Sequence, residues 1–172
     1  MSFNFGPTLL TWLQEHAPTT YQDILDADKK SCVHFNGYGS AMAQCYNHMI
    51  MPLANAQDRT TQVIWGIEDF RHRFGRDPEG MWLPETAVDL ETLDELTQHG
   101  IKFTILAPKQ AKAIRRIGNE EWKNVSERNL NTQRPYLCRL PSGRNIHLFF
   151  YDGVISGQIA FGKIIESEQK IL

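Results

Sequence analysis

The sequence predicts an α/β protein whose strands run parallel, in an open sheet or as part of a barrel. Four segments of strand-like composition alternate with helical patterns after an initial helical segment. Glycine, proline and capping residues separate most of these segments. The 172 residues are 41% hydrophobic and 22% charged, which is enough apolar material for a folded core and excludes a disordered chain.

The length limits what such a fold can contain. A closed βα barrel usually takes about 250 residues and seldom fewer than about 200. We therefore expect residues 1–172 to form one incomplete barrel-type domain, with about four parallel strands and flanking helices. No internal repeat or interdomain linker divides the sequence.

Local signals predict the individual elements. In the first part of the chain we expect a helix from residue 7 to a break at 17–18, a helix over 21–30, a strand over 31–36, and helices over 40–51 and from about 58 to 74. In the middle we expect a strand over 80–83, a helix over 90–99, a strand over 101–106 and a short helix to 117. In the last part we expect a polar loop over 118–133, paired strands over 137–140 and 145–151, and a helix over 155–172.

The clearest helix signals lie in the middle of the chain. Apolar residues recur at spacings of three and four from Val63 to Phe74, and Gly75 suits a helix end. Asp89 suits the cap of the next helix. Ser40 follows two glycines and predicts the start of the helix over 40–51 by the same rule.

Composition excludes several classes of partner. The net charge of −2 comes from 18 basic and 20 acidic residues, so no basic surplus favours nucleic acid. No apolar run reaches the length of a bilayer span, and the first residues lack a signal-peptide pattern. The three cysteines are widely spaced and form no metal or disulfide pattern, so we expect reduced thiols in a cytoplasmic protein.

Two carboxylates follow predicted strands, where functional groups gather in parallel βα folds. Glu85 and Asp152 would then stand at the same end of one sheet. Pro84 fixes the backbone before Glu85, and Trp82 precedes it by three residues. A carboxylate fixed in this way could attack an anomeric carbon and stabilise oxocarbenium character. The ordinary alternatives are a helix cap or salt bridge for Glu85, and a turn or N-cap for Asp152.

Histidines and aromatic residues supply further candidates for a sugar site. His48 could face a sugar hydroxyl or orient a carboxylate, although helical histidines are usually surface groups. His34, within the strand predicted over 31–36, could point into a barrel. Tyr38 and Trp82 could supply flat surfaces for sugar rings, although aromatics at helical spacing are more often core. The remaining histidines show no paired spacing, so we expect no metal site.

Several ordered segments resemble glycoside hydrolase family 57. The segment GMWLPE at residues 80–85 is similar to the family's nucleophile segment, and AQCYNHMIMPL at 43–53 to the segment after its second strand. Residues 103–108 also fit the family. Residues 148–156 resemble the strand before the acid/base motif, and residues 2–10 the stretch after the first strand.

The resemblance implies an incomplete (β/α)7 barrel, retaining chemistry on α-glucans and no metal cofactor. Glu85 carries over as the nucleophile, and His48 and Trp82 as substrate-site lining. Asp152 does not carry over as the acid/base, which the family places on a later strand. Ser40 stands where the family usually has glutamate, and the family's first strand would precede residue 1.

Three hypotheses remain open at this stage. The first is a fragment of a retaining glycosidase or transglycosidase acting on α-glucan, with an oligo- or polysaccharide as partner. The second is a carbohydrate-binding or degenerate remnant without turnover. The third is a polysaccharide-deacetylase-like barrel, which would need metal-binding residues. An incomplete barrel would leave two unpaired sheet edges, so we also expect self-association, which light scattering would test.

Overall fold

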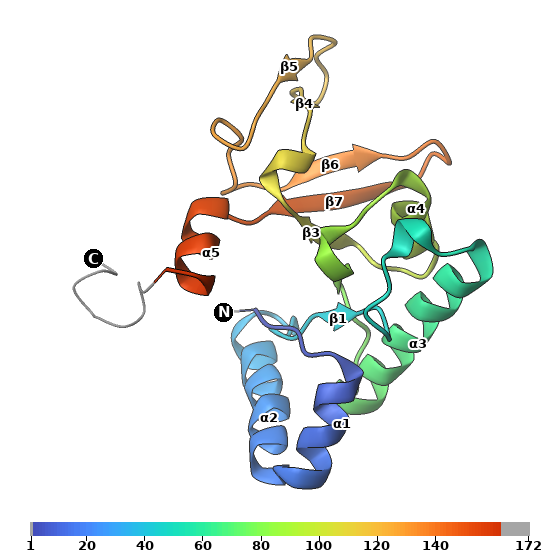
Figure 1. The fold of residues 1–172 in the computed structure, drawn as a ribbon, viewed down its shortest axis with the longest axis vertical. Coiled ribbons are helices and arrows are strands. Elements are labelled where there is room, and N and C mark those ends of the chain that lie inside the picture. Colours follow the sequence, from blue (N-terminus) through green and yellow to red (C-terminus); the bar gives the residue numbers. More distant parts are fainter. Residues whose placement is uncertain (1, 163–172) are drawn as a thin grey trace. The chain divides into compact units, whose positions relative to one another are not determined.

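The computed structural model describes residues 2–162 and has mixed α/β structure (Figure 1). Its elements are α1 (Pro7–His16), α2 (Pro18–His34), β1 (Ala43–Gln44), η1 (Met51–Leu53), α3 (Ala56–Phe74), β2 (Met81–Trp82), η2 (Pro84–Thr86), α4 (Leu90–Gln98), β3 (Phe103–Leu106), η3 (Pro108–Gln110), β4 (Ala113–Ile114), β5 (Lys123–Asn124), β6 (Tyr136–Arg139), β7 (Asn145–Phe150) and α5 (Gly153–Ala160).

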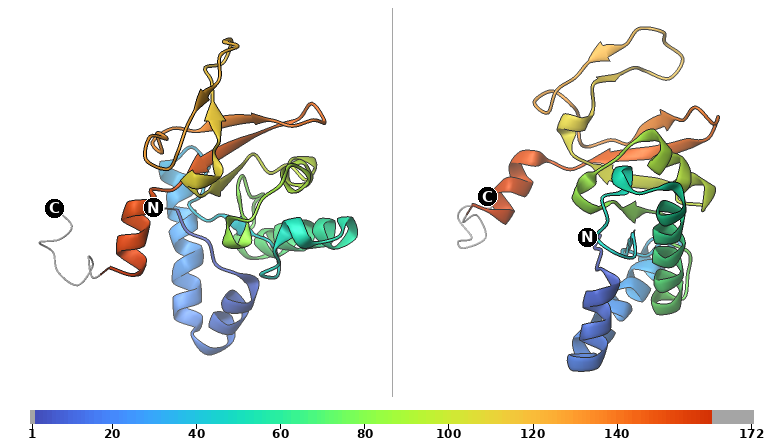
Figure 2. Two further views of the ribbon diagram at one scale, coloured as in Figure 1. Left: turned by 45° about the horizontal axis from the view of Figure 1, so that its top comes forward. Right: turned by 45° about the vertical axis from the view of Figure 1, so that its right-hand side comes forward.

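The described chain forms two compact units, which we treat separately. Unit 1 comprises residues 2–104 and 137–147, and unit 2 comprises residues 105–136 and 148–162. Unit 1 contains α1 to α4 and the strands β1 and β2. Within it α1 and α2 lie side by side as a helical hairpin (Figure 2).

A ladder of short parallel pairings runs through unit 1. Phe3 bridges Ala41, β1 pairs with β2, and Gly80 bridges Phe103, all in parallel. The buried hydroxyl of Thr104 donates to the Met81 carbonyl at 2.8 Å and ties the last two segments together. Parallel strands end at the same edge, so the residues that follow β1 and β2 are brought to one side.

The predicted strand over residues 31–36 is wrong, because α2 continues to His34. The backbone then turns with positive φ at Asn36 and Gly37. The strand that enters the ladder lies later, at residues 41–44. The helix predicted over 40–51 is therefore wrong as well, and of that range only the first residue of η1 is helical, as a 3-10 turn.

Tertiary contacts explain why residues 41–45 are extended. Ala41, Met42, Ala43 and Cys45 are buried, as expected for a strand covered on both faces. The buried Asp28 carboxylate on α2 accepts from the Ala41 amide at 2.7 Å and from Arg76. Arg76 also donates to the Ala41 carbonyl at 2.9 Å. These bonds replace the helical hydrogen bonds that Ser40 would have started.

The helices predicted in the middle of the chain are confirmed. The α3 helix starts behind Asn55, whose side chain accepts from the Asp58 amide, and ends at Gly75 in the left-handed conformation. The α4 helix starts behind Asp89, whose carboxylate accepts from the Thr92 amide at 2.7 Å. Both boundaries follow from capping rules that depend on a few neighbouring residues.

The three-stranded sheet has the order β3-β7-β6. The His147 amide donates to the Lys102 carbonyl in unit 1, and the Tyr151 amide to the Leu106 carbonyl in unit 2. In both bonds the donor and acceptor residues are separated by the same number of positions in the sequence. A constant separation of this kind is the pattern of two parallel strands. The predicted pairing of β6 with β7 is confirmed.

Unit 2 differs from the sequence prediction at β4 and at β5, which lies inside the loop predicted over 118–133. The helix expected up to residue 117 is only the short η3, because residues 113–114 pair with β5 in an antiparallel ribbon. The α5 helix begins at Gly153, two residues before the predicted range of 155–172, and residues 163–172 of that prediction lie outside the described residues. Within residues 2–162, no helix has both the length and the apolar character that a membrane span requires.

Candidate active site

Glu85 stands in a strained turn directly after β2. Its φ of 56° and ψ of 17° are left-handed, and Thr86 follows with φ 52°. Left-handed conformations are costly for residues with a Cβ and cluster at functional sites. Leu83 and Pro84 are buried and anchor the turn, whereas the Glu85 side chain is 71% exposed. The backbone therefore holds a carboxylate in solvent at a fixed place.

His48 follows β1, the parallel neighbour of β2, and meets this carboxylate. Its Nε2 atom lies 3.1 Å from Oε1 of Glu85, and the histidine side chain is 65% exposed. A protonated Nε2 donates this hydrogen bond to the carboxylate. The sequence placed His48 on a helix, but it lies in the irregular segment between β1 and η1. The two candidates come together because their strands end at the same edge.

The α3 helix holds the start of the His48 segment. The Tyr46 amide donates to the Gln62 carbonyl at 3.2 Å, and the Asn47 amide donates to Gln62 Oε1 at 2.6 Å. The Tyr46 ring packs edge-on against Trp65, with centroids 5.4 Å apart. One helix therefore fixes the backbone on the side of His48 nearest to β1.

The arrangement can support nucleophilic chemistry at a sugar carbon. A fixed, exposed carboxylate has a lone pair available at the second oxygen, while the first accepts from the imidazole. The imidazole restricts the rotamer of the carboxylate, which reduces the entropy lost in reaching an attack geometry.

The other predicted site residues lie elsewhere. Trp82 is half-buried in β2, three residues before Glu85. His34 ends α2 and is exposed, so it does not lie in a strand as the sequence suggested. Tyr38 is exposed in the turn after α2. Neither makes a hydrogen bond or ion pair with His48 or Glu85 among the contacts of the described residues.

Asp152 caps the amino end of α5. Its carboxylate accepts from the amides of Val154 at 3.0 Å and Ile155 at 2.9 Å. This is the N-cap alternative that the sequence offered for this residue. It belongs to unit 2, whereas Glu85 and His48 belong to unit 1.

Sequence reasoning did not identify Gln62 as a site residue. It is 5% exposed on the apolar face of α3, next to Val63 and four residues before Gly66. The available signal is a polar side chain on a buried helix face. Such a side chain needs a partner, and here the partner is the backbone beside His48.

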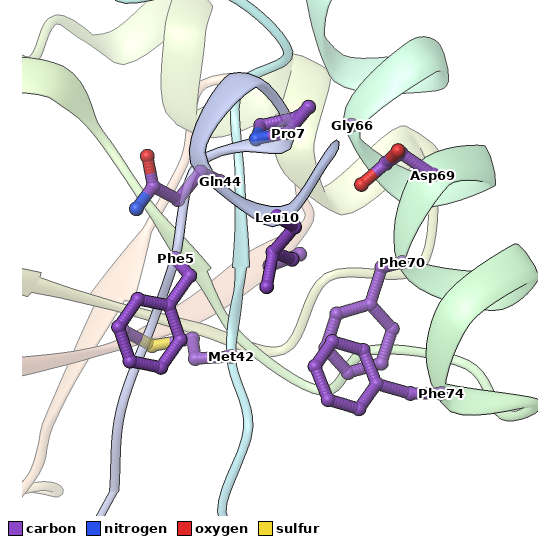
Figure 3. A pocket seen from close by; sticks show the side chains of 10 residues that line it. Phe5, Pro7, Leu10, Met42, Gln44, Gly66, Asp69, Phe70 and Phe74 are labelled. Atoms are coloured by element: carbon purple, nitrogen blue, oxygen red, sulfur yellow. The ribbon is translucent and has the colours of Figure 1, made fainter. Parts of the chain in front are cut away.

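A small cavity in unit 1 is too tight for a sugar. It lies among α1, β1 and α3 and is lined mostly by apolar side chains such as Leu10, Met42 and Phe70 (Figure 3). Its volume is about 10 Å³, room for about one water molecule. It is a packing gap, and the exposed His48–Glu85 pair lies outside its lining.

The part of the chain that the structure describes has no group of three or more histidine, cysteine, aspartate or glutamate side chains placed to hold a metal ion. The third hypothesis, a barrel of the polysaccharide-deacetylase type, would need such a group. Measurement of stoichiometric zinc in purified protein remains its test.

Comparison with known families decides the relationship. The sequence pattern of glycosyl hydrolase family 57 matches residues 5–169, nearly the whole chain. The chain belongs to this family. A curated relative, the 4-alpha-glucanotransferase of Thermococcus litoralis, is 24% identical over 106 residues, which are 62% of this chain and 15% of that protein.

Several solved structures contain a similar fold over part of their chains. The T. litoralis 4-alpha-glucanotransferase superposes with a TM-score of 0.65 at 22% identity, over 96% of this chain and 24% of that one. An exo-type maltose-forming amylase from Pyrococcus sp. ST04 gives 0.69 at 19% identity, over 94% and 24%. A putative polysaccharide deacetylase from Mycobacterium smegmatis gives 0.52 at 14% identity, over 87% and 46%. The chain thus spans 24% of the glucanotransferase and amylase structures.

Proposed function

We propose that this chain contributes the nucleophile side of an active site that cleaves or transfers α-glucans. Glu85 is the proposed nucleophile, and His48 orients its carboxylate. The observation that carries the proposal is the strained, exposed Glu85 held 3.1 Å from His48 where two parallel strands end. Membership of family 57, and the glucanotransferase and amylase among its solved relatives, support the substrate class.

In the proposed reaction a carboxylate oxygen of Glu85 forms a bond to the anomeric carbon as the glycosidic C–O bond breaks. The leaving oxygen takes a proton from a general acid, and the product is a glycosyl ester of Glu85. Water or an acceptor sugar hydroxyl then attacks the anomeric carbon, gives its proton to the conjugate base of the general acid, and releases the Glu85 carboxylate. Asp152 is not the proposed acid, because its carboxylate is engaged by two backbone amides.

The finer description of the fold is part of the same proposal. We infer that the parallel ladder from Phe3 to β7 forms part of the incomplete seven-stranded barrel that the family implies. The proposed site then lies where barrel enzymes carry their active sites, at the carboxyl ends of the strands.

The experiment compares wild type with Glu85→Gln on maltooligosaccharides, in a full-length homologue that also contains the general acid. Replacing the nucleophile should lower turnover at least about a thousandfold, since loss of a nucleophile removes the covalent route. Glu15→Gln, at an exposed position on α1, is the matched control and should leave turnover unchanged. Equal turnover by wild type and Glu85→Gln would rule out Glu85 as the nucleophile. Binding of maltooligosaccharides without any product would instead favour the carbohydrate-binding hypothesis.

A further inference from the structure

We propose that Gln62 and Arg59, both on α3, are positioning residues that hold the His48 segment against Glu85. The segment in question runs from residue 46 to 54. The inference rests on the proposed function only for its catalytic consequence, since the geometry concerns this chain alone. Both side chains are buried and polar on a helix whose other buried residues are mainly apolar.

Gln62 fixes the first end of the segment. Its side-chain oxygen accepts from the Asn47 amide at 2.6 Å, one residue before His48. Its main-chain carbonyl accepts from the Tyr46 amide at 3.2 Å. One residue therefore satisfies two consecutive amides, and the backbone reaches His48 in a defined direction.

Arg59 fixes the last end of the segment, one helical turn before Gln62. Its Nη2 donates to the Ala54 carbonyl at 3.2 Å. Its Nη1 donates to Glu91 Oε2 at 2.8 Å. Glu91 lies in the first turn of α4, six residues after Glu85. Arg59 thus links the segment that carries His48 to the segment that follows Glu85.

The two segments are consequently joined at two places. One is the direct contact of His48 with Glu85, and the other is the path from Ala54 through Arg59 to Glu91. A second connection restricts the relative movement of the two segments, so the imidazole and the carboxylate stay paired in the absence of a ligand.

The energetics favour positioning over stabilisation as the role of Arg59. The residue is 7% exposed, and among the described residues its buried Nε has no hydrogen-bond partner. Burying a cation with one donor unsatisfied is a poor source of stability compared with an apolar side chain of similar size. The defined geometry of the guanidinium fork accounts for an arginine here.

The test uses the ring nitrogen resonances of His48 in the full 172-residue chain at one fixed pH. His48→Gln assigns the signal, and Glu85→Gln defines its position when the contact is lost. Gln62→Leu and Arg59→Met should each move the His48 signal most of the way toward that reference. Gln62→Glu keeps an accepting oxygen and should restore the wild-type position. Gln57→Leu and Arg71→Met, at exposed positions of α3, are the matched controls and should not move it.

Amide exchange in the wild-type chain keeps the test valid if a variant fails to fold. The Asn47 amide should exchange at least about tenfold more slowly than expected for a solvent-bonded amide, because it donates to a buried oxygen. Free exchange of this amide, or an unmoved His48 signal in both folded variants, would overturn the proposal.

The catalytic consequence is measured separately. With maltooligosaccharides, Gln62→Leu should lower kcat by about a hundredfold with little change in KM, since misplacement of about 1 Å has effects of this size. If the His48 signal moves as expected but Glu85→Gln turns over normally, the positioning role stands and the proposed function fails. If the signal moves but kcat does not, the positioning role stands and its catalytic consequence fails.

Discussion

Gly66→Ala tests how closely α3 must approach β1 to place the His48 segment. A Cβ atom at position 66 would lie 2.1 Å from the Gln44 carbonyl oxygen and 3.3 Å from the Tyr46 nitrogen. Contacts below 3.0 Å are essentially never seen, so helix and strand must separate by about 1 Å. Both neighbours are backbone atoms, and Gln44 is held by its pairing with Trp82 in β2. No side-chain rotation can relieve the clash.

The size of the effect follows from two opposing terms. Overpacking of this kind costs about 1–3 kcal/mol, and a clash with backbone belongs in the upper part of that range, about 2–3 kcal/mol. Replacing glycine by alanine within a helix returns about 1 kcal/mol. The net loss is about 1–2 kcal/mol, and at about 2–4 °C per kcal/mol the melting temperature should fall by about 2–8 °C.

Thermal melting followed by far-UV circular dichroism measures this change. The matched control is Gly157→Ala in α5, where an added Cβ meets nothing within 4 Å. The same substitution there should leave the melting temperature unchanged or raise it, because only the helix-propensity term remains. A melting temperature for Gly66→Ala at or above that of the wild type would refute the close-approach argument.

Three further predictions address the strain, the charges and the thiols. Glu85→Gly should raise the free energy of unfolding by up to about 1 kcal/mol, because glycine adopts the left-handed conformation without strain. The same substitution removes the proposed nucleophile and should abolish turnover. A melting temperature below that of the wild type would contradict the strain at this position. Hydrogen bonds from Arg144, and then from Ser142, lower the pKa of Asp94. Its ionised form therefore stabilises the fold above about pH 4, the ordinary carboxyl pKa, and this stabilisation disappears as the pH falls through the lowered pKa. The melting-temperature difference between wild type and Asp94→Asn should therefore shrink on acidification, and a constant difference would argue against the ion pair. Burial raises the pKa of Cys45 to about 12, so a thiol reagent at neutral pH should label Cys45 much more slowly than the half-buried Cys32, and equal rates would contradict its burial.

The sequence was most informative where a few adjacent residues decide the structure. The ends of α3 and α4 follow from Asn55, Gly75 and Asp89, whose side chains or backbone complete the helix termini locally. The position of Glu85 after a strand was predictable for the same reason, since Pro84 and the short apolar run before it mark the exit.

The sequence was least informative where residues far apart in the chain determine the local structure. Residues 31–36 and 40–51 were assigned to the wrong elements, because the boundary depends on Asp28 and Arg76, which bind the backbone of Ala41 from far along the chain. His48 was a candidate to orient a carboxylate from its residue type, and a candidate for the substrate site from the resemblance to the family, but its contact with Glu85 arises only through the parallel pairing of β1 with β2. Local propensity contains no information about that pairing.

The polar groups near the two ends of β1 differ in how well they are satisfied. At its amino end Arg76 donates from all three nitrogens, and both oxygens of Asp28 accept, so this buried pair is fully satisfied. At its carboxyl end Glu85 is strained, and the buried Nε of Arg59 lacks a partner among residues 2–162. Strained or unsatisfied groups that gather at one place are expected where a protein keeps side chains in position for chemistry. The exits of β1 and β2 carry such groups in Glu85 and Arg59, which supports the candidate site without reference to any relative.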